Sequence, residues 1–150
     1  MLIIYIDADA CPVKEEVFRV ATRHNLQVYL VSNSRLSMIV DENVQKIQVT
    51  SDPDAADNWI CEHIKVGDIV VTVDILLADR CLKQGARAIS PTGKVFNSNN
   101  IGIAKEMREL RAYLRETGAA PSYNTSFSKQ NRSRFLQALE EMIQSIKKIS

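Results

Sequence analysis

The 150-residue sequence predicts an α/β fold, a three-layer sandwich in which helices cover both faces of a mostly parallel five-stranded sheet. Short runs of apolar and β-branched residues alternate with segments of helical apolar spacing, a pattern typical of parallel sheets. The composition, 45% hydrophobic and 25% charged, is that of a globular protein. The length suits one domain, so residues 1–150 are expected to fold as a single unit.

The first part of the chain predicts three strands and two longer helices. Proline at position 12 favours a helix start there, and the acids at positions 15 and 16 suit the positive end of that helix. The segment Ser51-Asp52-Pro53-Asp54 combines an N-cap residue, a first-turn proline and a first-turn acid, which predicts a second helix start. The expected strands are Leu2–Ile6, Val28–Val31 and Lys46–Val49, with helices at Val13–His24 and from Ser51, and a short helix at Leu36–Val40.

The second part predicts two strands and three helices. Asp74 follows a buried strand and opens a helix that Gly85 closes, and Ser90–Gly93 interrupts the chain. The expected strands are Ile69–Val73 and Arg87–Ile89, and the helices are Asp74–Gln84, Ile101–Glu116 and Asn131–Ile146, the last two separated by a loop at Thr117–Lys129. Apolar residues at helical spacing in Ile101–Glu116 predict that this helix docks on the domain, with a homodimer contact as the alternative: Ile103, Met107, Leu110 and Leu114.

Right-handed crossovers restrict the strand order, because about 98% of parallel units connect in that hand. With five strands counted along the chain, the expected order is about 3-2-1-4-5, with the C-terminal helices added. The first and fourth strands are then neighbours at the switch point. Ligands of open α/β sheets bind beyond the carboxyl ends of the strands at such a point.

Acidic residues follow both of these central strands. Asp7 and Asp9 come at the end of the first strand, and Asp74 comes at the end of the fourth. If the strands are adjacent, these carboxylates converge, and either their pKa values rise or a cation lies among them. Hard divalent cations such as Mg²⁺ prefer carboxylate oxygens. The sequence therefore predicts a cation site at this edge of the sheet.

Other acids admit two interpretations each. Asp74 is also a natural helix N-cap, and Asp54 serves the dipole of its own helix. Asp57 suits a solvated helix face as well as a site. Asp79 shares the inward stripe of its helix, which favours a role inside the protein.

The cysteine count and the N-terminus predict a cytoplasmic protein with no membrane association. Cys11, Cys61 and Cys81 are odd in number and have no CxxC spacing, which suits a reducing compartment and buried thiols. The N-terminus lacks the basic region of a signal peptide, and no apolar run approaches the ~20 residues of a membrane span.

Several segments together resemble the bacterial YaiI/YqxD family over essentially the whole chain. The most specific is Asp7-Ala-Asp9-Ala-Cys11-Pro12-Val-Lys14; the others are Asp54-Ala-Ala-Asp57, Gly67-Asp68-Ile-Val-Val-Thr72-Val-Asp74-Ile-Leu-Leu-Ala78 and Gly85-Ala-Arg87. The fold of that family is similar to PIN-like and NYN-like domains, which are metal-dependent ribonucleases with a carboxylate cluster. The resemblance implies a metal-dependent phosphodiesterase that acts on nucleic acid, most naturally RNA.

The resemblance also implies roles for individual residues. Mg²⁺ or Mn²⁺ would be held by four acids, Asp7, Asp57, Asp74 and Asp79, with catalysis assigned to Asp7, Asp9 and Asp74. Asp9 belongs to the family's own pattern and not to PIN domains at large. The basic residues expected to hold nucleic-acid phosphates are Lys14, Arg35, Arg132 and Arg134. Asn131 stands where the family pattern has an acid, so no role is carried over to it.

Two other functions fit parts of the same pattern. A haloacid-dehalogenase-like phosphatase would use Asp7 as nucleophile, with Asp9 completing the Asp-x-Asp signature and Ser32 as a second motif. Against it, the helix that begins near Pro12 leaves no room for the flap of those enzymes. A non-catalytic nucleic-acid-binding or assembly module that retains the acids is the second alternative.

Overall fold

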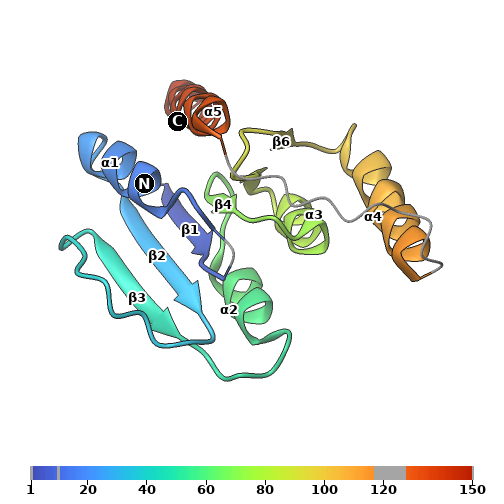
Figure 1. Ribbon diagram of the computed structural model, residues 1–150. Helices are drawn as coiled ribbons and strands as arrows, with labels where there is room; N and C mark the ends of the chain where they lie inside the picture. The colour runs from blue at the N-terminus through green and yellow to red at the C-terminus, as the bar shows by residue number, and fades with distance from the viewer. Residues whose placement is uncertain (1, 10, 117–127, 150) are drawn as a thin grey trace.

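The computed structural model describes residues 2–9, 11–116 and 128–149. Its sheet has six strands in the order β3-β2-β1-β4-β5-β6 (Figure 1). Adjacent strands pair in parallel except β6, which is antiparallel to β5. The three-layer α/β class and the order 3-2-1-4-5 are confirmed, with one strand more than expected. The strands are β1 (Ile3–Asp7), β2 (Gln27–Ser32), β3 (Val44–Gln48), β4 (Ile69–Val71), β5 (Arg87–Ile89) and β6 (Val95–Phe96).

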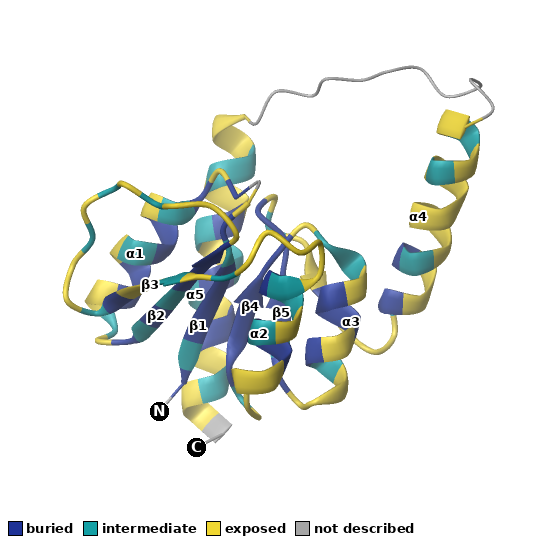
Figure 2. Ribbon diagram, turned by 90° about the horizontal axis from the view of Figure 1, so that it is seen from below, coloured by how far each residue is buried: buried dark blue, intermediate teal, exposed yellow. Residues whose placement is uncertain are grey.

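Helices lie on both faces of this sheet. Figure 1 shows α1 and α5 on one face and α2 and α3 on the other. The remaining helix, α4, continues beyond α3 and stands apart from the sheet, with most of its surface exposed (Figure 2). The helices are α1 (Lys14–Arg23), α2 (Ala55–His63), α3 (Ile75–Lys83), α4 (Ile101–Glu116) and α5 (Lys129–Ile149).

The central strand β1 is buried on both faces, which explains its continuous apolar sequence. Ile4 and Ile6 point to the core beneath α1 and α5, where Phe135 is fully buried. Tyr5 points to the opposite core beneath α2 and α3, together with Leu77. Because successive side chains alternate across a strand, this division between two cores fixes the register of β1. Asp7 then lies at the carboxyl end of the strand.

The short helix expected at Leu36–Val40 is wrong, because this segment is irregular. Leu36, Met38 and Val40 alternate with exposed residues and pack against the core under α1, a period of two that a helix cannot produce. Lys46 Nζ donates to the carbonyl oxygens of Leu36 (3.2 Å) and Met38 (2.9 Å), so these oxygens are satisfied without helical hydrogen bonds.

Two further differences concern the second half of the chain. The break at Ser90–Gly93 is a tight turn in which Ser90 N donates to Lys94 O (2.9 Å), and it leads into β6, a strand that the sequence pattern does not predict. The last helix spans more than Asn131–Ile146 because Ser128 Oγ accepts a hydrogen bond from Asn131 N (3.1 Å) near its start. Residues 117–127 of the expected loop lie outside the described residues.

The helix α4 docks on the domain as expected, because it packs against α3, but the predicted apolar stripe does not make this contact. Its buried side chains are Ile101 and Ala104, whereas Ile103, Met107 and Leu110 remain 65%, 43% and 48% exposed. None of the helices in the described part of the chain combines the length and apolar character that a membrane crossing requires.

Candidate acidic site at the carboxyl edge of the sheet

Asp7 and Asp74 lie on neighbouring segments because β1 pairs directly with β4. Thr72 links them, since its Oγ1 donates to Asp7 Oδ2 (2.9 Å) and accepts from Asp74 N (3.0 Å). Asp74 also caps α3, where its Oδ1 accepts from the backbone amides of Leu76 (2.9 Å) and Leu77 (3.3 Å). Asp74 therefore has the predicted N-cap role and also lies at the predicted site.

The Asp7 carboxyl group is half-buried and faces other negative charges. Burial raises its pKa above the ordinary value, and the hydrogen bond from Thr72 opposes this rise. Asp9 and Asp74 raise the pKa further by charge repulsion. Asp9 and Asp74 therefore lie near enough to Asp7 for their charges to act on its carboxyl group.

Asp57 comes to the same place from the first turn of α2. Burial, the charges of Asp74 and Asp7, and a hydrogen bond with the Asp74 carboxyl group raise the pKa of Asp57 from 3.8 to about 7. Asp54, the residue before α2, adds a smaller effect in the same direction. Asp57 thus belongs to a cluster of carboxylates and is not simply part of a solvated helix face. We call Asp7, Asp57 and Asp74 the acidic cluster.

Asp9 lies beside the cluster and connects two loops. Its Oδ1 accepts from Ser32 Oγ (2.7 Å), and its Oδ2 accepts from the backbone amide of Asn33 (3.3 Å). Ser32 is fully buried at the end of β2, so this pair ties the segment after β1 to the segment after β2. The main contacts of Asp9 therefore position the edge of the sheet.

Asp79 has a different environment from the other predicted ligands. Its Oδ2 lies 3.1 Å from Lys83 Nζ and 3.2 Å from Lys105 Nζ. Burial raises the pKa of Asp79, but the hydrogen bonds from the two lysines outweigh burial and hold it below the ordinary value. The structure turns Asp79 toward α4, where it holds that helix against α3, and does not bring it to the acidic cluster.

The predicted basic residues differ in what they contact. Lys14 Nζ donates to Cys11 O (3.1 Å), close to the turn that follows β1. Arg132 donates through Nη1 to Pro12 O and to Glu16 Oε1, both at 2.9 Å, and so attaches the start of α5 to α1. Arg35 and Arg134 are exposed. Lys14 and Arg132 thus both donate to backbone oxygens of the segment between β1 and α1.

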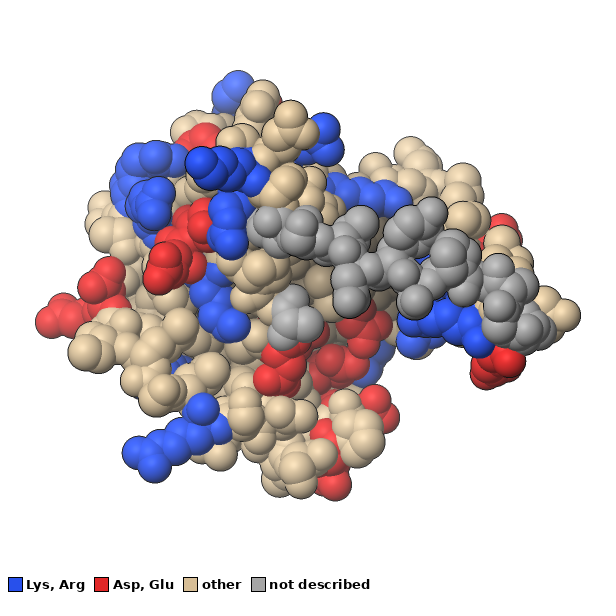
Figure 3. Space-filling model, in the orientation of Figure 1, with Lys and Arg blue, Asp and Glu red and all other residues tan. Residues whose placement is uncertain are grey.

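The surface shows how these charges are distributed. On the face in Figure 3, acidic side chains gather near the carboxyl end of β1 and the adjoining parts of α2 and α3. Basic side chains gather over α1 and the near end of α5. A negative cluster with a positive border is the charge pattern expected of a cation site that also receives a polyanion.

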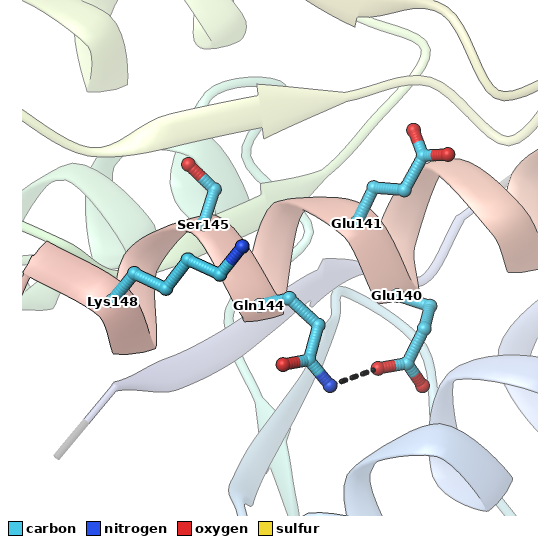
Figure 4. A pocket seen from close by; sticks show the side chains of 5 residues that line it. All are labelled: Glu140, Glu141, Gln144, Ser145 and Lys148. Carbon is cyan, nitrogen blue, oxygen red and sulfur yellow. Dashed lines mark hydrogen bonds between the residues drawn. The ribbon is translucent and has the colours of Figure 1, made fainter.

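Neither of two hollows in the described part of the molecule is lined by a predicted site residue. One, of about 420 Å³, lies along α5, where Gln144 Nε2 donates to Glu140 Oε2 (3.0 Å; Figure 4). The other, of about 520 Å³, is lined by Leu2, His24, Asn25, Leu26, Val66, Gly67, Ile146 and Lys147. Neither hollow coincides with the acidic cluster.

The donor set of the acidic cluster fits some divalent cations better than others. Among residues 2–9, 11–116 and 128–149, no group of three or more His, Cys, Asp or Glu side chains is arranged to hold a metal ion. Mg²⁺, however, commonly binds through one or two carboxylates together with water and substrate phosphates. The hydrogen bond between the carboxyl groups of Asp57 and Asp74 brings two such donors together. The cluster fits a cation of this kind and not one that needs an all-protein cage.

Thr72 is the site residue that the sequence did not single out. It is 1% exposed and contacts both Asp7 and Asp74. The signal was a lone hydroxyl residue directly after three buried apolar residues at the end of β4. A polar side chain at such a position needs partners, because a buried polar group is costly without a hydrogen bond.

The fold and the edge acids define an α/β protein with an acidic cluster at the switch point of a parallel sheet. The chain belongs to the uncharacterised BCR, YaiI/YqxD family, whose model matches residues 5–145. A UPF0178 protein of Rhodospirillum rubrum is 53% identical over 146 residues, covering 97% of both chains. A UPF0178 protein of Rhizobium etli is 50% identical over 147 residues, covering 98% of this chain and 95% of that protein. No solved structure matches the chain.

Proposed function

We propose that the protein is a metal-dependent phosphodiesterase that acts on RNA, with Mg²⁺ or Mn²⁺ bound at the acidic cluster. The observation that carries this proposal is the state of Asp57, whose pKa is raised to about 7 by burial and by Asp74 and Asp7. Carboxylates that repel one another in this way are stabilised when a cation replaces the proton. The resemblance to PIN-like ribonucleases points to the same chemistry.

Each residue has a part that follows from its contacts. Thr72 holds the Asp7 carboxylate in one orientation, and the N-cap bonds of Asp74 fix the second carboxylate. Asp57 gains or loses its proton near neutral pH, the range in which a side chain works well as a general acid or base. Lys14, beside the turn after β1, would attract the phosphate backbone. A bound divalent cation would supply charge neutralisation at the phosphate and an activated water.

The test combines metal binding with RNA cleavage. The wild-type chain is expected to bind Mn²⁺ with release of protons, measured by calorimetry in buffers of different ionisation enthalpy, and to cleave single-stranded RNA only with the metal. Asp7→Asn and Asp74→Asn are each expected to lower cleavage by at least ~100-fold, the range seen when charge-stabilising groups are removed. Asp41→Asn, an exposed acid before β3, is the matched control and keeps full activity. Cleavage that survives both cluster substitutions contradicts the proposal.

The phosphatase alternative has one observation against it and a distinct signature. The helix α1 begins at Lys14, soon after Asp7, so the segment between them has no space for a flap. Ser32 Oγ is also engaged by Asp9. An aspartyl-phosphate on Asp7, found by mass spectrometry after incubation with a phosphate ester, would support this alternative instead. RNA binding without cleavage under any divalent metal would support the non-catalytic module.

A further inference from the structure

Cys61 and Cys81 form a pair of free, buried thiols that the proposed function does not use. Cys61 lies near the end of α2 and Cys81 lies in the second half of α3, the helix packed against it. The two thiols share a hydrogen bond. The sequence predicted only that each is buried in the core, and their contact is a product of the helix packing.

The two sulfur atoms differ in reactivity. The hydrogen bond from Cys81 lowers the pKa of Cys61, burial opposes this, and the charge of Arg80 lowers it again. The Arg80 guanidinium is held in place by Asn58 Oδ1 on α2 (3.1 Å). The same hydrogen bond and burial raise the pKa of Cys81 far above its ordinary value. Cys61 is therefore the sulfur with more thiolate character, and the thiolate is the reactive form.

Access to solvent follows the same order. Cys61 retains 8% exposure, whereas Cys81 is fully buried at 0%. Of the two thiols, Cys61 is therefore the more accessible to a small oxidant. Low thiol pKa, some exposure and an adjacent second thiol are the features of redox-sensing cysteines.

We propose that Cys61 and Cys81 are a redox-sensitive pair that a hydroperoxide converts to a disulfide between α2 and α3. In the first step the Cys61 sulfur attacks the O–O bond, gains the hydroxyl group as a sulfenic acid and releases one water when the peroxide is hydrogen peroxide. In the second step the Cys81 sulfur attacks Cys61, the S–S bond forms, and the hydroxyl group leaves with the Cys81 proton as a second water. Two thiols lose two electrons, and one peroxide gains them.

Cys11 provides a contrast within the same chain. It is also buried, but burial raises its pKa to about 11, and its backbone amide donates to Ala8 O in the turn after β1. Cys11 is therefore expected to remain reduced. The inference depends on the contact between two thiols and stands whether or not the chain cleaves RNA.

The test is thiol mapping of the full-length wild-type chain. After brief exposure to an equimolar amount of hydrogen peroxide, the protein is quenched, unfolded, alkylated and digested for mass spectrometry. We expect a cross-linked Cys61–Cys81 peptide, and free thiols that fall from three to one per chain, with Cys11 alkylated. Cys11→Ser is expected to form the same cross-link, and Cys61→Ser is expected to leave Cys81 reduced.

Two results would overturn the inference. One is that Cys61 and Cys81 are both recovered in alkylated form after the folded chain has been exposed to hydrogen peroxide. The other is that Cys61 accumulates as sulfinic acid with no link to Cys81, which would mean that the two sulfur atoms cannot close to bonding distance. Because the wild-type mapping decides between these results, the inference is tested even if the Cys61→Ser chain does not fold.

Discussion

Asp57 is harder to ionise in the folded chain than in the unfolded one, since burial and two neighbouring carboxylates oppose its charge. The folded state therefore keeps a proton that the unfolded state releases near the ordinary pKa of 3.8. Stability from this group is fully present below about pH 4 and is lost as the pH rises to about 7.

Asp57→Asn is expected to remove the loss of stability that occurs as the pH rises to about 7. At about pH 8 the variant should be more stable than the wild type by about 1–2 kcal/mol, a value discounted for the solvent that reaches the cluster. At about pH 4 the two chains should unfold at similar urea concentrations. Urea unfolding across this pH range measures the difference. Asp41→Asn is the control, and equal unfolding of Asp57→Asn and wild type at the higher pH would contradict the argument.

The Thr72 hydroxyl group is expected to affect both stability and metal binding, because it bonds Asp7 and Asp74. Thr72→Val keeps the shape of the side chain but leaves the Asp74 amide and one Asp7 oxygen without their partner. We expect a loss of about 1–3 kcal/mol in the free energy of unfolding and weaker Mn²⁺ binding, because the Asp7 pKa rises further. Thr50→Val removes an exposed hydroxyl that donates to Asp52 Oδ2 (3.0 Å) and should change neither quantity.

At the scale of elements, the turn between β5 and β6 supports α5. Gly93 has φ +91°, and a Cβ atom there would lie 2.8 Å from the Arg134 carbonyl carbon and 2.9 Å from Phe135 N. This glycine is needed both for its backbone conformation and for the close approach of the helix. The contact explains how a turn after a short strand helps to seat Phe135 in the core.

Gly67 allows the effect of backbone conformation to be separated from the effect of close approach to α5. It has φ +85°, yet a Cβ there would meet no atom within 4 Å. Gly67→Ala should cost about 1–2 kcal/mol from its conformation alone. Gly93→Ala should cost more by at least about 2 kcal/mol, because the α5 backbone must also move. Thermal and urea unfolding of both variants test this, and equal losses would show that the turn does not support α5.

At the scale of the whole molecule, α4 leaves an apolar stripe in solvent. Ile103, Met107 and Leu110 are spaced as in the seam of a two-stranded coiled coil. Glu106 lies on one side of this stripe and Arg111 on the other, so two parallel copies would place opposite charges together. The homodimer therefore remains a prediction, and the expected contact is a parallel coiled coil of two α4 helices.

Light scattering at increasing protein concentration tests that geometry. The wild type is expected to reach the mass of a dimer, and Leu110→Glu is expected to remain monomeric because it places a charge in the seam. Val95→Glu is the matched control, since Val95 is also exposed (39%) but lies on β6. A wild-type chain that stays monomeric would leave the exposed stripe without this role.

The sequence alone determined the features that depend on local patterns and on chain topology. Apolar strands alternating with helices predicted the parallel sheet, and the predicted order of strands was enough to place Asp7, Asp9 and Asp74 at one edge. The cap at Asp74 was predicted from its position after a strand. These features depend on residues close together in the chain and on the right-handed connection of parallel strands. The sequence is sufficient to apply both.

Only the tertiary structure decided which side chains meet across elements. It paired Asp79 with Lys105, brought Cys61 to Cys81, joined Asp57 to the cluster, and replaced the helix at Leu36–Val40 by an extended segment under Lys46. Each outcome depends on how two separate elements pack, and several side chains of similar polarity compete for each position. Local periodicity carries no information on that competition, because packing energies are set by contacts between residues far apart in the chain.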